Sequence, residues 1–301
     1  MWLCRSVQTG VALLLAGTAA MRLLAWRSAP VGAVPRWDRL AVVGWGALLL
    51  AAVLQLGLTA AQMSDQPLGQ VLHGDALAAV LRGTHFGAVW KVRMALVTGL
   101  LVTEVFGAVA HRSASHRLTA IADVAASLLI VSLLASLVAS GHAQASEQRG
   151  WLLPADMIHA AVAGAWPGGL LPLVILLAQA RRQPDLLLPA ITITRRFSRL
   201  SVVAVGLLAS SGLLNAYALV GTFAGLWSGV YGRLIVCKGL LSLTMVALGA
   251  MNKGLIEQEP MADAHTTVRR LWRNVTVESA VAVAVLFATE ALAMSTPAAS
   301  G

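Results

Sequence analysis

Long apolar runs, separated by short clusters of charge, constrain this chain more than any other feature of its sequence. A helix needs about 20 apolar residues, at about 1.5 Å of rise each, to cross the roughly 30 Å hydrocarbon core of a bilayer. Because the runs are continuous and do not alternate, they favour helices over barrel strands. The sequence therefore predicts an all-α membrane protein, a polytopic bundle of eight transmembrane helices. Their approximate limits are 6–26, 39–62, 87–110, 118–140, 151–180, 196–222, 230–252 and 271–294.

The composition is typical of a protein embedded in a lipid bilayer. Charged residues make up 12% of the chain, against about 25% in a typical globular domain. The net charge of +9 comes from basic residues at helix ends, so it reports topology and does not predict a nucleic-acid partner. Eight spans leave no connection long enough for a soluble domain, and we expect a single transmembrane domain over 1–301. The P-loop motif GxxxxGK[ST] is absent, so no ATP-driven step and no enzyme activity are predicted.

The basic residues predict the orientation of the bundle. Most of the 22 Lys and Arg lie in the odd-numbered connections, while the sixth connection (223–229) has none. By the positive-inside rule the odd connections face the cytoplasm, and both termini are periplasmic. This orientation places four histidines on or near the outer side, namely His73, His85, His142 and His159.

Several ionisable residues fall inside the predicted spans, where a charge costs about 2.5–3.5 kcal/mol at mid-bilayer. Lys238 lies about 12 Å along the seventh span, where it either pairs with Glu290 or Asp156 or lines a polar cavity. Glu104 and Asp123 lie nearer the cytoplasmic half, and we expect them to be paired or interfacial.

The fifth predicted helix carries the strongest candidates for chemistry. Asp156 and His159 are spaced i, i+3 and so share one face, where a carboxylate can orient an imidazole. Pro167 is expected to bend this helix. Gly164 and Gly168 form a small-xxx-small pair that allows another helix to approach closely.

His142 precedes this helix directly, and Gly141 frees the backbone there to fold over the mouth of the bundle. His142 and His159 are therefore the predicted metal ligands, with His85 as a weaker third and His73 left open. Imidazole suits copper in either oxidation state, and also zinc or haem iron. Methionine would favour Cu(I), and Met157 is the one methionine close to these histidines in sequence.

An ordered series of short motifs resembles the copper resistance protein D (CopD/PcoD) family of inner-membrane proteins. The resemblance spans essentially the whole chain and is clearest over 84–298. Pro167 is a departure, since the family leads us to expect an aliphatic residue there. The matching stretches are Ser140–Ala143, Asp156–Ala161, Trp166–Leu170, Arg196–Leu200, Gly212–Ala216, Tyr231–Leu234 with Lys238, Ala250–Asn252, and Val277–Ser279 through Ser295–Pro297.

The resemblance implies copper transport or uptake across the bacterial inner membrane. Copper would be accepted from a separate periplasmic carrier (CopC-like) at a histidine site near the outer face. The family's histidines map onto His142 and His159. Its other recurrent polar or aromatic positions map onto Asp156, Trp166, Asn215, Tyr231 and Lys238.

Two alternatives remain open at this point. One is a membrane redox protein in which His142 and His159 ligate haem b. The other is a copper-delivery assembly subunit that transports nothing itself. A homo-oligomer is compatible with each of these interpretations.

Overall fold

The computed structural model describes residues 2–26, 37–71, 75–112, 115–138, 149–220, 225–258 and 263–295. Within these ranges the chain is helical and contains no strand, so the predicted fold class is confirmed. Eight helical stretches are long and apolar enough to cross a membrane. The elements are α1 (Trp2–Ala25), α2 (Trp37–Ser64), α3 (Leu68–Val71), α4 (Ala76–Gly83), α5 (His85–Arg112), α6 (His116–Val138), α7 (Arg149–Ala165), α8 (Pro167–Ala180), the 3₁₀ turn η2 (Pro184–Leu186), α9 (Leu187–Val220), α10 (Gly225–Ser228), α11 (Val230–Gln258) and α12 (Ala264–Met294).

Two helices begin well before the positions that the sequence predicts, which are 196 and 271. The sixth spanning helix, α9, starts at Leu187 directly after η2, and the eighth, α12, starts at Ala264. Arginine has a high helix propensity, so these basic segments continue the helices beyond their apolar runs. Arg195, Arg196 and Arg199 therefore lie on α9 and not in a connection.

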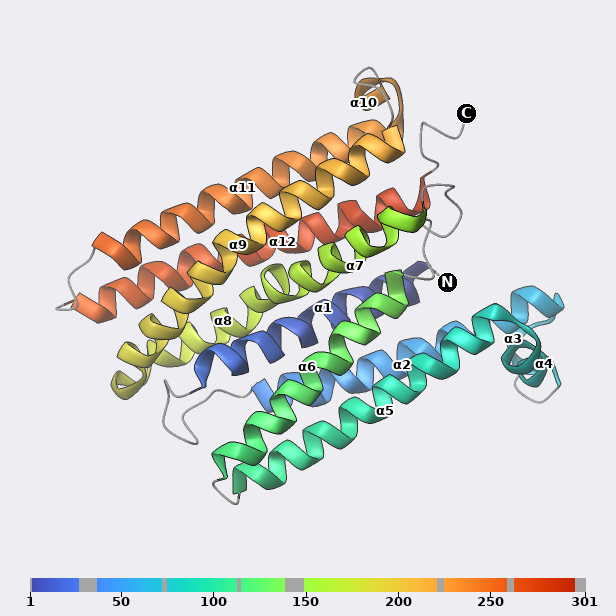
Figure 1. The fold of residues 1–301 in the computed structure, drawn as a ribbon, viewed down its shortest axis with the longest axis horizontal. Helices are drawn as coiled ribbons and strands as arrows, with labels where there is room; N and C mark the ends of the chain where they lie inside the picture. The colour runs from blue at the N-terminus through green and yellow to red at the C-terminus, as the bar shows by residue number, and fades with distance from the viewer. Residues whose placement is uncertain are drawn as a thin grey trace.

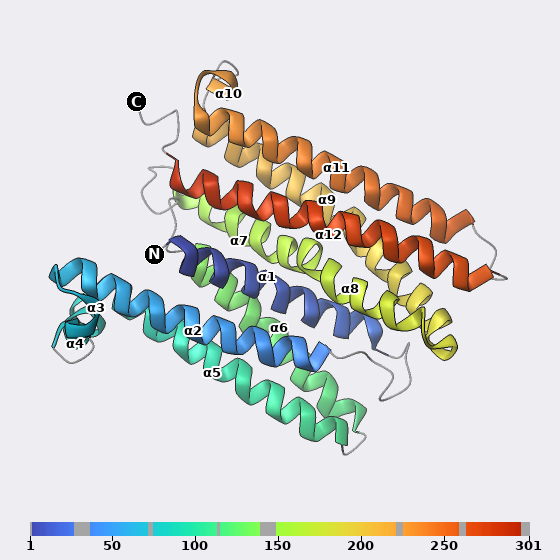
Figure 2. The same ribbon diagram turned by 180° about the vertical axis from the view of Figure 1, so that it is seen from behind.

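The helices form two groups that share α1. In Figures 1 and 2, α2 and α5 lie at one edge of the bundle and α9 and α11 at the opposite edge. Helix α1 lies between them and packs against α2 and α6 on one side and α7 and α8 on the other. Its residues Ala12, Leu15 and Ala19 belong to the apolar core of α1, α2, α5 and α6, whereas Met21 and Ala25 belong to the core of the other group.

The start of α1 and the end of α12 lie at the same end of the bundle (Figure 1). We call this the terminal end, and the opposite end, which carries Arg181, Arg182, Arg195, Arg269 and Arg270, the arginine-rich end. The sequence predicts that the terminal end is periplasmic.

The fifth span is broken at Trp166, as Pro167 predicts. Helix α7 ends at Ala165 and α8 begins at Pro167, which occupies the first turn of α8. Helix α1 crosses at this break with its backbone against that of α8. A Cβ atom on Gly168 would overlap the carbonyl group of Leu13, and one on Gly17 would overlap the backbone of Gly168. The predicted close approach at Gly168 is therefore confirmed.

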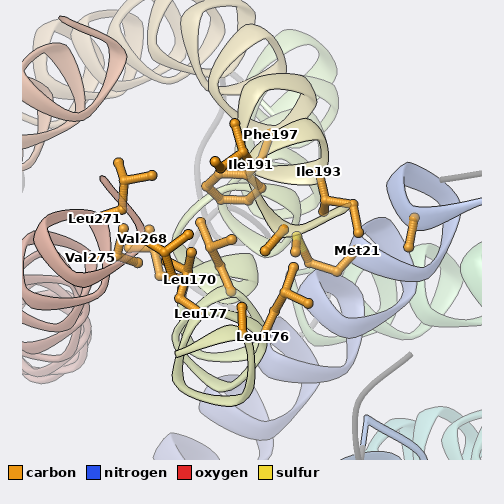
Figure 3. Close-up of a cluster of buried hydrophobic side chains, with 14 of the residues drawn as sticks. Met21, Leu170, Leu176, Leu177, Ile191, Ile193, Phe197, Val268, Leu271 and Val275 are labelled. Atoms are coloured by element: carbon orange, nitrogen blue, oxygen red, sulfur yellow. The ribbon is translucent and has the colours of Figure 1, made fainter. Parts of the chain in front are cut away.

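A dry apolar cluster fills the arginine-rich half of the second group. Figure 3 shows side chains of α1, α8, α9 and α12 meeting there, among them Met21, Leu176, Ile193 and Leu271. Each of these four is at most 2% exposed. Apolar side chains packed in this way leave few voids large enough for a water molecule.

The first group has an internal ion pair in its arginine-rich half. Arg22 on α1 binds Glu104 on α5 through two contacts of 2.8 and 2.9 Å, and Asp123 on α6 lies 3.9 Å from the same guanidinium. Glu104 and Asp123 are thus paired, one of the two outcomes expected for them.

Candidate functional site

A cluster of polar side chains lies inside the second helix group, towards the terminal end. Three helices contribute to it, and by helical rise all of its members except Tyr231, which lies at the start of α11, are about 8–15 Å from the helix ends. We call it the outer cluster. Its members are Asp156 and His159 on α7, Ser211 and Asn215 on α9, and Tyr231 and Lys238 on α11.

Ser211 fixes the ring of His159. The Nδ1 atom of His159 lies 2.9 Å from the hydroxyl oxygen of Ser211, and that hydroxyl donates its own proton to the carbonyl of Leu207 at 2.6 Å. Because the hydroxyl has one proton, it accepts from Nδ1–H, and the lone pair of the imidazole is then on Nε2. The ring lies beside Gly212, where a Cβ would be 3.8 Å from its Cε1 atom. This is the arrangement of a metal-binding histidine, with one nitrogen anchored and the other available.

Asp156 has a different partner from the one predicted. Its Oδ1 atom accepts a hydrogen bond of 2.5 Å from the side-chain amide of Asn215. The sequence predicts that Asp156 orients His159, but the structure gives that role to Ser211. The Oδ1 atom of Asn215 is buried and has no hydrogen-bond donor among the described residues. An unpaired buried acceptor next to a carboxylate suits a cationic ligand.

Lys238 is the positive group of the outer cluster. It interacts electrostatically with both Asp156 and His159, and Tyr231 also interacts electrostatically with Asp156. Of the two partners predicted for Lys238, Asp156 is the one that the structure brings near. Glu290 instead accepts a hydrogen bond of 3.3 Å from Ser6 on α1.

The other predicted site residues are not gathered in the outer cluster. His85 is exposed at the start of α5, which packs against α2, α4 and α6 at the opposite edge of the bundle (Figure 2). Trp166 lies at the helix break, 5% exposed, and Met157 is partly buried on α7. His142 and His73 lie outside the described residues. Within the described ranges, no three His, Cys, Asp or Glu side chains are grouped to hold a metal ion.

Sequence reasoning missed Ser211. A serine in an apolar helix ordinarily bonds to its own backbone, as Ser210 does with Gly206. The usable signal was its i, i+4 spacing to Asn215, which places both residues on one face of α9.

Fold and cluster together define a polytopic membrane protein with a polar site buried between its helices. Two family models match this chain. "Copper resistance protein D-like, N-terminal domain" covers residues 1–153, and "Copper resistance protein D" covers residues 191–292. The chain belongs to the copper resistance protein D family, which the sequence motifs had indicated. The prediction of a multi-pass protein of the bacterial inner membrane agrees with this membership and with the eight spans.

Two characterised relatives carry copper in their names. The chain is 29% identical over 285 residues to the copper transport protein CutJ of Bacillus subtilis (strain 168), covering 94% of this chain and 50% of that protein. It is 29% identical over 219 residues to copper resistance protein D of Pseudomonas syringae pv. tomato, covering 68% and 64% respectively. The chain thus spans about half the length of the first relative and less than two thirds of the second. No solved structure matches it.

Proposed function

We propose that this protein carries copper across the bacterial inner membrane in the direction of uptake. The observation that carries the proposal is the outer cluster, in which the anchored imidazole of His159 keeps Nε2 available near Asp156 and the unpaired oxygen of Asn215. Family membership supports copper as the substrate. A separate periplasmic carrier delivers the ion to the terminal end, and the chain acts as one transmembrane unit.

The chemistry of the outer cluster suits a copper ion in transit. The Nε2 atom of His159 supplies a nitrogen ligand accepted by both oxidation states, and His142 adds the second imidazole. Asp156 offsets part of the ion's charge. In the metal-free protein this carboxylate is balanced by Lys238, whose positive charge opposes copper and favours release.

Replacing both proposed ligands should remove copper binding. We expect the double variant His142→Ala/His159→Ala to lose at least about 100-fold in copper affinity, more than the 10–100-fold typical of outer-shell changes. The measurement is a copper titration of purified protein against a competing chelator, followed by uptake into proteoliposomes. His85→Ala is the matched control, because His85 is exposed on α5 at the other edge of the bundle.

Unchanged stoichiometry and affinity in the double variant would overturn the site. Copper binding without uptake by the wild-type protein would favour a delivery subunit over a transporter. A Soret band in the absorption spectrum of the purified protein would show that it binds haem, and would favour the haem-protein alternative over copper transport.

Ser211→Ala should weaken copper binding without removing a ligand. Loss of the hydroxyl releases the anchored ring of His159, and we expect affinity to fall by about 10–100-fold. Ser210→Ala is the control, since Ser210 is the exposed neighbour that bonds to Gly206. Equal affinities of the two variants in the same titration would show that Ser211 does not position His159.

A further inference from the structure

A second buried polar cluster lies where α11 and α12 meet Trp166, at the break between α7 and α8. It consists of Glu278 on α12, Asn252 on α11 and Trp166, which are 2%, 6% and 5% exposed. The side-chain amide of Asn252 donates to Oε2 of Glu278 at 3.0 Å. We call this the inner cluster. His159 of the outer cluster precedes Trp166 by two helical turns of α7.

Both polar residues occupy positions that helix packing would fill with apolar side chains. On α12, the buried residues Val268, Leu271 and Val275 recur at helical spacing, and Glu278 is the next position of that stripe. On α11, Asn252 lies one turn before the buried Ile256. A carboxyl group at such a position is costly to bury, so packing alone does not account for it.

Hydrogen bonding in the inner cluster is incomplete. Among the described residues, Oδ1 of Asn252 has no donor and Nε1 of Trp166 has no acceptor, although both atoms are buried. The Trp166 indole interacts with the Glu278 carboxyl group but lies outside hydrogen-bond geometry. Each unsatisfied buried group costs about 1–3 kcal/mol. Among the described residues the cluster therefore lacks a donor for Oδ1 of Asn252 and an acceptor for Nε1 of Trp166.

No cation among the described residues is placed to neutralise Glu278. Helix α12 packs against α8, α9 and α11 and also touches α1. Helix α8 contains no ionisable residue, and on α1 Arg22 is paired with Glu104 while Arg5 interacts electrostatically with Arg93. The charged groups of α9 and α11 are engaged elsewhere: Arg195 and Arg196 bond to the carbonyls of Ile256 and Leu24, Lys253 pairs with Glu257, and Lys238 interacts electrostatically with Asp156. Arg199 and Arg233 are exposed, as are Arg269, Arg270 and Arg273 of α12 itself.

We propose that Glu278 is an intramembrane proton-binding site. In its ionised form the carboxylate accepts from Asn252 and, after a small movement, from Trp166. In its neutral form the carboxyl group gains an O–H donor, the kind of group that Oδ1 of Asn252 lacks. The step is the reversible transfer of one proton to a carboxylate oxygen, with no change of oxidation state. Membrane-embedded carboxyl groups serve as proton relays in pumps and transporters.

The inner cluster suits a proton better than a second copper ion. Copper prefers imidazole and sulfur ligands, and the described residues that contact Glu278 offer only an amide and an indole. The backbone of Gly249 is also close, since a Cβ there would lie 3.7 Å from Oε1 of Glu278. Towards the arginine-rich end, the dry cluster of Figure 3 closes this region.

Proton binding can be tested without copper and without transport. The experiment is infrared difference spectroscopy of the purified protein in lipid, recorded across a pH series in H₂O and D₂O. We expect a deuterium-sensitive carboxylic-acid carbonyl band that titrates in the wild type and is missing in Glu278→Gln. Glu290→Gln is the control, because Glu290 is equally buried but accepts from Ser6. Persistence of the band in Glu278→Gln, or its absence from the wild type, would overturn the proposal.

Asn252→Ala provides a second test if Glu278→Gln fails to fold. It removes the hydrogen bond that Glu278 accepts from Asn252, so the band should remain and its titration midpoint should move. An unmoved midpoint would contradict the role of the inner cluster.

The role of this proton site in transport depends on the proposed copper function. We expect a pH gradient to stimulate copper uptake into proteoliposomes, and Glu278→Gln to lose that stimulation while copper affinity stays at the wild-type value. Stimulation that survives in the variant would refute the coupling. If the wild type takes up no copper, the transport proposal fails, and the infrared band alone then decides whether Glu278 binds a proton.

Discussion

Valine in place of Gly168 should prevent the bundle from assembling. A Cβ at this position would overlap the backbone carbonyl of Leu13 on α1. Backbone atoms in a packed helix cannot rotate aside as a side chain can, so α1 and α8 would have to separate. We expect a loss of about 3 kcal/mol or more, at the upper end of overpacking effects, and the same for Gly17→Val.

Thermal unfolding in detergent, followed by size-exclusion chromatography, measures this effect. Gly239→Val is the control, because a Cβ at Gly239 on α11 meets no atom within 4 Å. It carries the same change in helix propensity without the clash. Equal melting temperatures for the valine variants at positions 168 and 239 would show that the helices do not cross at Gly168.

Replacing Arg22 should lower the stability of the protein nearly as much as Gly168→Val does, for an electrostatic reason. Arg22→Met leaves Glu104 without the guanidinium that binds it through two contacts, in a place where the side chains are 13% and 18% exposed. Removing one partner of a buried ion pair typically costs about 3–5 kcal/mol. The nearby Asp123 adds repulsion, since it shares the same guanidinium.

The comparison for Arg22 is Lys253→Met, which breaks an exposed pair with Glu257 on α11. Exposed pairs contribute about 0–1 kcal/mol, so this variant should melt close to the wild type. Combining Arg22→Met with Glu104→Gln should restore part of the lost stability, because the uncompensated charge is removed. A single variant Arg22→Met that melts like Lys253→Met would contradict the ion pair.

The number and class of the helices could be predicted from the length of the apolar runs, because a bilayer demands that length. The residues at which α9 and α12 begin could not be predicted from these runs. Before Phe197 and before Leu271 the chain is rich in arginine, and hydropathy does not separate a basic loop from a helix that continues out of the membrane.

The candidate site was predictable in part. Spacing along one helix put Asp156 and His159 on a common face, and the family resemblance added Asn215 and Lys238. Which side chain touches which depends on how α7, α9 and α11 pack, and no sequence pattern shows that Ser211 meets His159. The placement of His85 at the other edge of the bundle likewise depends on packing, since its outer-side position was all that the charge pattern could predict.

The central place of α1 has a consequence for how this protein is made. Helix α1 is synthesised before all of the helices that cover it, which are α2, α6, α7 and α8. Its buried Gln8 finds its partner Gln55 on the next helix, α2, whereas Arg22 has no Glu104 to bind until α5 has been made. Because α1 contributes residues to the apolar cores of both groups, we expect a defect in this one helix to disturb the assembly of both.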